Sequence, residues 1–169
     1  MPMSQHISFT IRQSSLGSIL VGLSESGICA ISLGSDPDSL VADLHDRFPK
    51  ATLTRGDTAI EKLAGEVAAA VESPRRQLRL PLDIGGTPFQ QRVWQALREI
   101  PPGTTATYTN IAARLGAPAS MRAVARACGA NPIAVAIPCH RVVGRDGRLS
   151  GYRWGVERKR ELLFRESRA

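Results

Sequence analysis

The strongest chemical signal in the sequence is a cysteine followed at once by a histidine and an arginine. Cys139, His140 and Arg141 come after an apolar run over residues 133–137 and a proline. A thiolate is a strong nucleophile, and a neighbouring imidazole or guanidinium lowers the pKa of a thiol. Adjacent side chains seldom bond each other directly, so a Cys139–His140 couple requires a bridging water or a turn. The stretch predicts a reactive cysteine; a buried structural cysteine beside a surface histidine is the alternative.

The other two of the three cysteines lack such a context. Cys29 lies in an apolar run and Cys128 precedes a glycine, so both are expected to pack in the core. Together with His6 and His45 they show none of the close ligand spacing of a structural zinc site, so no metal is expected. An odd and small number of cysteines is not a disulfide framework, which points to a reducing cytosol.

Several polar and aromatic residues flank the candidate nucleophile. Asn131 is either an ordinary turn residue or the residue that holds the loop presenting Cys139. Tyr108 is either a core aromatic or a hydroxyl donor to a ligand. Residues 147–155 form an aromatic, basic and glycine-rich loop around Tyr152. Loops of this kind line pockets and can stack on a nucleic-acid base.

The positive charge of the chain is concentrated in its second half. The net charge is +7, made of −2 over residues 1–88 and +9 over residues 89–169. Arginine supplies 19 of the 22 basic residues, and its planar fork suits phosphate. This asymmetry favours a nucleic-acid partner; a solvated arginine-rich surface is the alternative. Glu166, placed among these basic residues, is by itself no more than a solvated ion-pair residue.

Residues 109–128 have the pattern of a helix-turn-helix. A short helix ends at Gly116, and a second helix over 120–128 carries Arg122 and Arg126 four residues apart, on one face. Such a pair suits a phosphate or a DNA groove. Two ordinary packed helices with solvated arginines fit the same pattern.

The framework around these residues divides at Gly85. Before it, apolar runs between glycines predict strands over 6–13, 18–23 and 28–33. Two amphipathic patterns predict helices over 36–48 and 58–71, and an extended segment follows over 78–84. After it, Thr87, Pro88 and Gln90 form a capping box that begins a helix. The helices then expected are 87–100, 109–115, 120–128 and 155–166.

These elements predict an α+β fold of two lobes. Residues 1–84 would form an N-terminal lobe with a small antiparallel sheet and helices, and residues 85–169 a helical C-terminal lobe. The 169 residues, 43% hydrophobic and 22% charged, suffice for a core. No apolar run reaches the roughly 18 residues of a membrane span, and the first residues do not resemble a secretory signal.

Taken together, the motifs resemble one family. The Pro-Cys-His-Arg-Val stretch at 138–142, preceded by Asn131-Pro132 and followed by residues 150–155, is similar to the O6-alkylguanine-DNA alkyltransferases, also called methylated-DNA–protein-cysteine methyltransferases. Residues 89–97 and 100–108 are similar as well. The likeness covers nearly the whole chain and is closest to the C-terminal domain of bacterial Ada-type proteins. It implies a helix-turn-helix of the winged-helix-like type.

The resemblance implies a DNA repair protein that acts once and needs no cofactor. O6-alkylguanine would be flipped out of duplex DNA, and its alkyl group would pass irreversibly to Cys139. His140 would act on the thiol through a water, and Glu166 would orient His140. Asn131 would hold the turn that places the thiol. Tyr108 would protonate or hydrogen-bond the guanine leaving group and crowd the phosphate.

The resemblance also implies a DNA surface and a base pocket. Arg122 would fill the space of the flipped base, and Arg126 and Ala123 lie on the same helix, which would enter the minor groove. The pocket residues implied are the backbone carbonyls of Cys139 and Val142, the Tyr152 wall and the Arg153 amide. The partner would be double-stranded DNA and not a membrane. The protein would act as a monomer in the bacterial cytosol and would lie at the nucleoid when it is bound to DNA.

Three other functions fit parts of the sequence. A damage sensor of this fold binds alkylated guanine but lacks the acceptor thiol, whereas Cys139 is present. A helix-turn-helix regulator with a redox cysteine explains the basic half but not Tyr108, the Tyr152 loop and Glu166 together. A cysteine hydrolase would require turnover and an oxyanion hole, and adjacent Cys139 and His140 are an awkward dyad.

Overall fold

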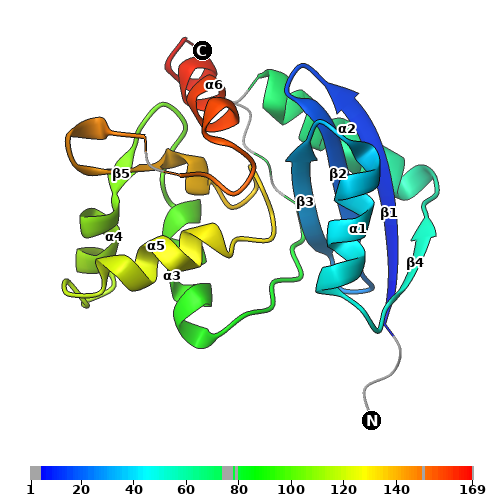
Figure 1. The fold of residues 1–169 in the computed structure, drawn as a ribbon, viewed down its shortest axis with the longest axis horizontal. Coiled ribbons are helices and arrows are strands. Elements are labelled where there is room, and N and C mark those ends of the chain that lie inside the picture. The colour runs from blue at the N-terminus through cyan, green and yellow to red at the C-terminus, as the bar shows by residue number, and fades with distance from the viewer. Residues whose placement is uncertain (1–4, 74–77, 79, 150, 169) are drawn as a thin grey trace.

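The computed structural model describes residues 5–73, 78, 80–149 and 151–168. Figure 1 shows a sheet flanked by helices on one side of the molecule and a mainly helical part on the other. Most of the segment between the helix expected at 58–71 and the extended stretch expected at 78–84 lies outside the described residues. The α+β class predicted from the sequence is confirmed.

The sheet has four strands in the order β3-β2-β1-β4. β1 (His6–Ser14), β2 (Gly17–Leu23) and β3 (Ile28–Gly34) are antiparallel, as expected. β4 (Thr52–Arg55) pairs in parallel with β1 and was not predicted. The expectation of a purely antiparallel sheet was therefore wrong at this edge, because β4 is short, mostly exposed and carries no apolar run.

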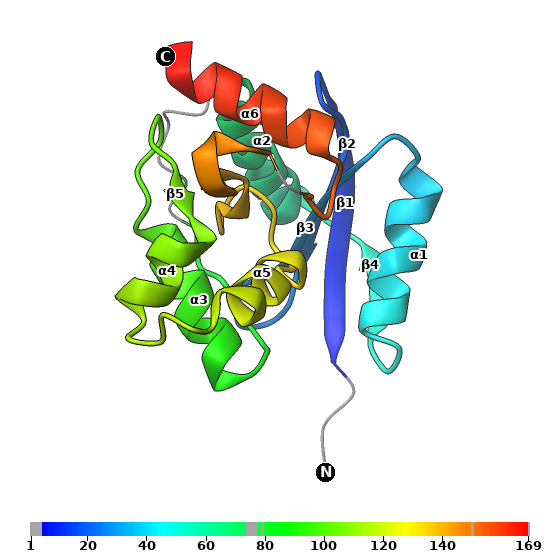
Figure 2. The ribbon, with the colours of Figure 1, turned by 60° about the vertical axis from the view of Figure 1, so that its left-hand side comes forward.

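Helices cover both faces of the sheet (Figure 2). α1 (Pro37–Arg47) is capped by Asp36 and buries Leu40 and Leu44 against one face. α2 (Thr58–Glu72) is capped by Asp57 and packs its apolar side on the other face. The alternation of side chains along each strand separates the two sets. The α2 side belongs to a large core that continues into the C-terminal half.

The C-terminal half is built from short helices. The elements are α3 (Pro88–Arg98), β5 (Ala106–Thr107), α4 (Tyr108–Arg114), α5 (Met121–Gly129), the 3-10 turns η1 (Cys139–Arg141) and η2 (Arg145–Gly147), β6 (Val142–Val143) and α6 (Val156–Arg168). The predicted helices are confirmed with ends within two residues. α3 begins with the predicted capping box, and α4 turns into α5 through Gly116, whose φ of +73° suits glycine. β5 and β6 pair in parallel.

Arginine side chains tie the two halves together by donating to backbone carbonyls across the boundary. The Arg158 Nε lies 2.7 Å from the Leu16 oxygen, and the Arg165 Nη1 lies 2.9 Å from the Val71 oxygen. Arg47 of α1 donates from Nη1 to the Pro132 oxygen at 3.2 Å, next to the loop that leads to Cys139. No helix in the described part of the chain is long and apolar enough to cross a membrane.

Candidate active site

The loop from Asn131 to Cys139 is closed by the side chain of Asn131. This fully buried amide donates from Nδ2 to the Ile137 oxygen at 2.8 Å and to the Cys139 Sγ at 3.2 Å. Its Oδ1 accepts the Ile133 amide at 2.9 Å. One residue therefore fixes both ends of the loop and the position of the thiol, as the second interpretation of Asn131 requires.

The same loop contains a strained residue. Val135 has φ of +69°, and the Ala136 amide donates to the Ala134 oxygen at 2.7 Å across it. A β-branched residue rarely adopts this conformation, which costs about 1–3 kcal/mol. The Asn131 bonds and the packing around the loop hold Val135 in this conformation. The position of Cys139 at the end of the loop is therefore fixed by several contacts together.

His140, Arg141 and Glu166 form a buried charged network behind Cys139. The His140 Nε2 lies 2.9 Å from the Glu166 Oε2. The Arg141 Nη2 lies 2.8 Å from the same oxygen, and its Nε lies 3.1 Å from both carboxylate oxygens. His140 is fully buried and Glu166 is 1% exposed. The surface histidine and the solvated ion pair, the two alternatives drawn from sequence, are therefore both wrong.

Burial dominates the ionisation of the thiol. It raises the pKa of Cys139 to about 11, although the Asn131 hydrogen bond and the positive charge of Lys159 both act to lower it. Lys159 is 1% exposed, and burial lowers its own pKa. Burial also lowers the pKa of His140, against the hydrogen bond and charge of Glu166. The resting site therefore favours a neutral thiol and a neutral imidazole.

A cavity of about 450 Å³ opens in front of Cys139. Its lining comes from α4, α5, η1 and the loop before α6, and consists of Tyr108, Ala125, Cys128, Gly129, Cys139, Gly151, Tyr152 and Arg153. The Tyr152 hydroxyl is buried and has no hydrogen-bond partner among the described residues. A buried polar group without a partner normally meets a water or a ligand. The cavity thus offers the Cys139 nucleophile to a bound molecule.

The predicted residues fall into a cavity set and an outer set. Tyr108, Cys139, Tyr152 and Arg153 share the cavity, with Asn131, His140 and Glu166 bonded behind the thiol. Val142 is buried in β6 directly after η1 and does not line the cavity. The outer set lies on α5, where Arg122 and Arg126 are exposed and Ala123 is half-buried. It also does not line the cavity.

Two residues near the thiol were missed by sequence reasoning. Lys159 is the only lysine among the 14 basic residues of the second half, and that singularity was the available signal. Arg141 was considered only as a neighbour that could lower the thiol pKa. The structure directs its guanidinium to Glu166 instead, and its Nη1 donates to the Ile100 oxygen at 2.7 Å.

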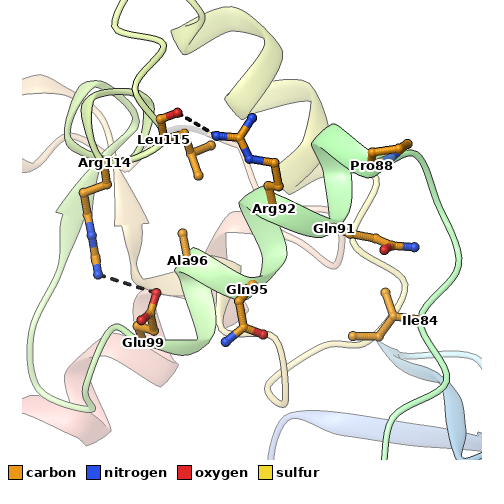
Figure 3. Close-up of a pocket in the computed structure, with 9 residues that line it drawn as sticks. All are labelled: Ile84, Pro88, Gln91, Arg92, Gln95, Ala96, Glu99, Arg114 and Leu115. Atoms are coloured by element: carbon orange, nitrogen blue, oxygen red, sulfur yellow. Dashed lines mark hydrogen bonds and ion pairs between the residues drawn. The ribbon is translucent and has the colours of Figure 1, made fainter.

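A second, larger hollow of about 750 Å³ lies along α3 (Figure 3), and Cys139 is not among the residues that line it. Its charged groups are already engaged, because Arg92 donates to the Leu115 oxygen at 2.7 Å and Arg114 lies 3.6 Å from Glu99. The described residues that line it include no cysteine, serine, threonine or lysine. In the described part of the chain, no three His, Cys, Asp or Glu residues gather as metal ligands. The chemistry of the molecule therefore centres on Cys139.

Comparison with known proteins identifies the family of this chain. A family model described as the 6-O-methylguanine DNA methyltransferase, DNA binding domain, matches residues 88–168. An inducible methylated-DNA–protein-cysteine methyltransferase of Bacillus subtilis is 46% identical over 123 residues, which cover 73% of this chain and 69% of that protein. The chain belongs to the family of methylated-DNA–protein-cysteine methyltransferases, and the resemblance predicted from its motifs is confirmed.

Within this family the chain is similar to Ada proteins. It is 54% identical over 151 residues to the regulatory protein ada of Salmonella typhimurium, covering 89% of this chain and 43% of that protein. It is 50% identical over 161 residues to the bifunctional transcriptional activator/DNA repair enzyme Ada of Escherichia coli, covering 95% and 46%. The chain thus spans less than half the length of these two relatives.

The fold is also that of a solved structure. The crystal structure of Mycobacterium tuberculosis OGT in complex with DNA matches with a TM-score of 0.79 and 34% identity, over 96% of this chain and 93% of that one. The match extends over both halves of the molecule, including the sheet.

Proposed function

We propose that this chain repairs DNA by transferring the alkyl group of O6-alkylguanine to its own Cys139, irreversibly and once. The observation that carries the proposal is the Cys139 thiol, held by Asn131 at 3.2 Å, in the wall of a cavity of about 450 Å³. That volume falls in the range of small-molecule sites and suits one planar base. The family name of the Bacillus subtilis relative supports the same reaction.

The transfer is an in-line displacement at the alkyl carbon. The Cys139 sulfur forms a bond to that carbon while the bond from carbon to O6 breaks, and its electron pair stays on guanine. The thiol proton passes to the His140 Nδ1 through a bridging water. This nitrogen is buried without a partner among the described residues. Lys159 favours the developing thiolate, and Tyr108 gives the leaving guanine a hydrogen bond or proton.

The base pocket reads the flipped guanine with backbone and aromatic groups. The backbone carbonyl of Cys139 and that of Val142, which lies just behind the lining, accept from the guanine amino group, and the Arg153 amide donates to O6. Tyr152 forms a wall, braced by Trp154, whose ring centroid lies 5.2 Å away at an interplanar angle of 71°. The position of Tyr152 in the lining of the cavity, together with Cys139, supports this assignment.

Duplex DNA lies against α5, the second helix of the helix-turn-helix. Flipping a base costs a few kcal/mol of stacking and pairing, and Arg122 offsets part of this by filling the vacated space. Arg126 and Ala123 contact the same groove, the minor one, and the β5–β6 pair is the wing of a winged-helix-like unit. The DNA complex of the Mycobacterium tuberculosis relative supports a DNA partner.

The protein works as a monomer of two lobes, residues 1–84 supporting residues 85–169, in the bacterial cytosol and at the nucleoid when bound. A thioether is a very poor leaving group, and no second nucleophile bonds to Cys139 in the described part of the chain. The product therefore persists, and each molecule accounts for one lesion.

Intact mass after incubation with a duplex holding one O6-methylguanine tests the proposal. We expect a gain of one methylene unit per protein, saturating at one, in wild type and in Cys128→Ser, whose altered thiol lines the same cavity. Cys139→Ser should gain nothing. Tight binding to the damaged duplex without mass gain would indicate a sensor, and neither binding preference nor gain would indicate a helix-turn-helix regulator.

A further inference from the structure

Arg141 is a buried cation that the transfer step, as described, does not use. It is 9% exposed and lies in η1 between His140 and β6. Its side chain makes four hydrogen bonds, three to the Glu166 carboxylate at 2.8–3.1 Å and one to the Ile100 oxygen at 2.7 Å. A paired guanidinium in this geometry holds a carboxylate in one orientation.

Glu166 in turn decides which ring nitrogen of His140 carries the hydrogen. An ionised carboxylate only accepts hydrogen bonds, so the His140 Nε2, at 2.9 Å, must be the donor. In the neutral ring this leaves a lone pair on Nδ1. That atom is buried and has no partner among the described residues. Keeping Glu166 ionised therefore keeps Nδ1 able to accept a proton.

The charges facing His140 come from two places among the described residues, α6 and its own turn. Glu166 and Lys159 face it from α6, and Arg141 from its own turn; the Tyr152 hydroxyl on the neighbouring loop is affected by Glu166. Burial alone would raise the pKa of Glu166, but the bonds and charges of His140 and Arg141 lower it overall. Burial lowers the pKa of His140, Glu166 acts to raise it, and Arg141 opposes Glu166. Without Arg141, Glu166 would favour a charged imidazole.

We propose that Arg141 is a positioning residue of the transfer reaction: it clamps the Glu166 carboxylate so that His140 waits as the neutral Nε2–H form, with Nδ1 free to take the thiol proton. A second consequence is mechanical, since the bond to Ile100 ties this arrangement to the end of α3. The inference rests on the proposed transfer to Cys139, because it assigns the residue that prepares the proton acceptor of that step.

The first test reads the ring state without DNA, by nitrogen NMR of the histidine side chains during a pH titration. In wild type, His140 should remain the neutral Nε2–H form at pH 7. Arg141→Gln keeps a donor to Glu166 but removes the charge, and the protonation midpoint of His140 should rise by about one pH unit or more, a tenfold change in the ratio of charged to neutral ring. Arg141→Lys keeps the positive charge, so its His140 midpoint should lie close to that of wild type. The matched control is Arg145→Gln, at an exposed arginine four residues later.

The second test is the rate of alkyl transfer against pH in the same variants. Arg141→Gln should be slower than wild type at acidic pH, by about tenfold at a pH below both His140 midpoints, and should recover toward wild type as the pH rises. Adding Glu166→Gln to Arg141→Gln should lower the His140 midpoint again toward the wild-type value, because this change removes the negative charge that Arg141 balances.

A wild-type His140 midpoint in Arg141→Gln, or an equal loss of rate at every pH, would overturn the inference and leave Arg141 a purely structural residue. A raised midpoint that survives Glu166→Gln would also overturn it. Failure of wild type to accept an alkyl group would overturn the proposed function instead, and the DNA-free titration would still report on Arg141.

Discussion

Two parts of the interior are buried by different chemistry. Between α1 and the sheet, the enclosed side chains are apolar: Ile7, Phe9, Leu20, Cys29, Ala30, Leu40 and Leu44. Around η1 and α6, the interior holds His140, Arg141, Lys159 and Glu166, each no more than 9% exposed. Apolar burial stabilises a fold directly, whereas buried charges at best break even with apolar residues of similar size. The comparison indicates that the charged interior is kept for chemistry.

Removing one member of the charged interior should have the largest effect. Glu166→Ala leaves Arg141 buried without its carboxylate, and we expect the free energy of unfolding to fall by about 3–5 kcal/mol, with alkyl transfer lost. Urea unfolding followed by tryptophan fluorescence measures the first quantity, and protein mass after incubation with damaged DNA the second.

The double variant Arg141→Met with Glu166→Leu sharpens this result. Both charges are replaced by apolar groups, so the unfolding free energy should return to wild type or exceed it by about 1–4 kcal/mol, while transfer stays lost. If the double variant were as unstable as Glu166→Ala, the charged network would be a source of stability, and the contrast between the two interiors would disappear.

Truncating a side chain in the apolar interior should lower the free energy of unfolding nearly as much but should leave alkyl transfer unchanged. Leu44→Ala removes a side chain that is 2% exposed, and we expect a loss of about 2–5 kcal/mol in unfolding free energy. The fraction of folded molecules that accept an alkyl group should be unchanged at a temperature where the variant is folded. Reduced transfer by folded Leu44→Ala would mean that α1 also positions the site.

Lowering the pH should reduce the free energy of unfolding through the charged interior and not through the apolar one. The pKa of His140 is lowered on folding from its ordinary 6.5, so the unfolded chain binds more protons and stability falls as the pH drops below 6.5. The slope contributed is at most about 1.4 kcal/mol per pH unit. The lowered pKa of Glu166 acts in the same direction at lower pH. Denaturant unfolding between pH 6.5 and 5 should show this slope in wild type and Leu44→Ala, and a smaller one in His140→Gln.

The smallest effect is expected where the two regions meet at the surface. Asp43 of α1 lies 3.7 Å from Arg47 and 3.9 Å from Arg153, and its side chain is 46% exposed. Exposed pairs contribute about 0.2–1 kcal/mol, so Asp43→Asn should change the unfolding free energy by no more than that. Asp46→Asn, an exposed carboxylate on the same helix, is the control. A loss above 2 kcal/mol would show that the two regions depend on this contact.

Local signals were enough to predict most of the framework. The capping box at Thr87, the glycines between apolar runs and the helical stripes placed the main strands and helices within two residues. β4 escaped because four mostly exposed residues, Thr52–Arg55, have no apolar pattern and owe their pairing to the neighbouring β1. Its parallel register depends on tertiary contacts that a local pattern does not contain.

The residues of the site were predictable from the sequence, but the hydrogen bonds and ion pairs among them were not. Cys139 was identified from its neighbours, and the family resemblance implied the partners of the thiol. The burial of Glu166 against His140, 26 positions apart in the chain, is a product of the fold. The direction of Arg141 depends on the same long-range packing, and for that reason it was first assigned to the wrong neighbour.

The edge-to-face contact between Tyr152 and Trp154 has an optical consequence. The chain has two tryptophans, both nearly buried: Trp154 lies against the cavity wall, and Trp94 of α3 donates from Nε1 to the Ala127 oxygen at 2.8 Å. A base entering the cavity would change the surroundings of Trp154 and leave those of Trp94 nearly unchanged. With Trp94→Phe as the background, the emission of a single indole would follow the arrival of a damaged base in real time, before any covalent bond forms.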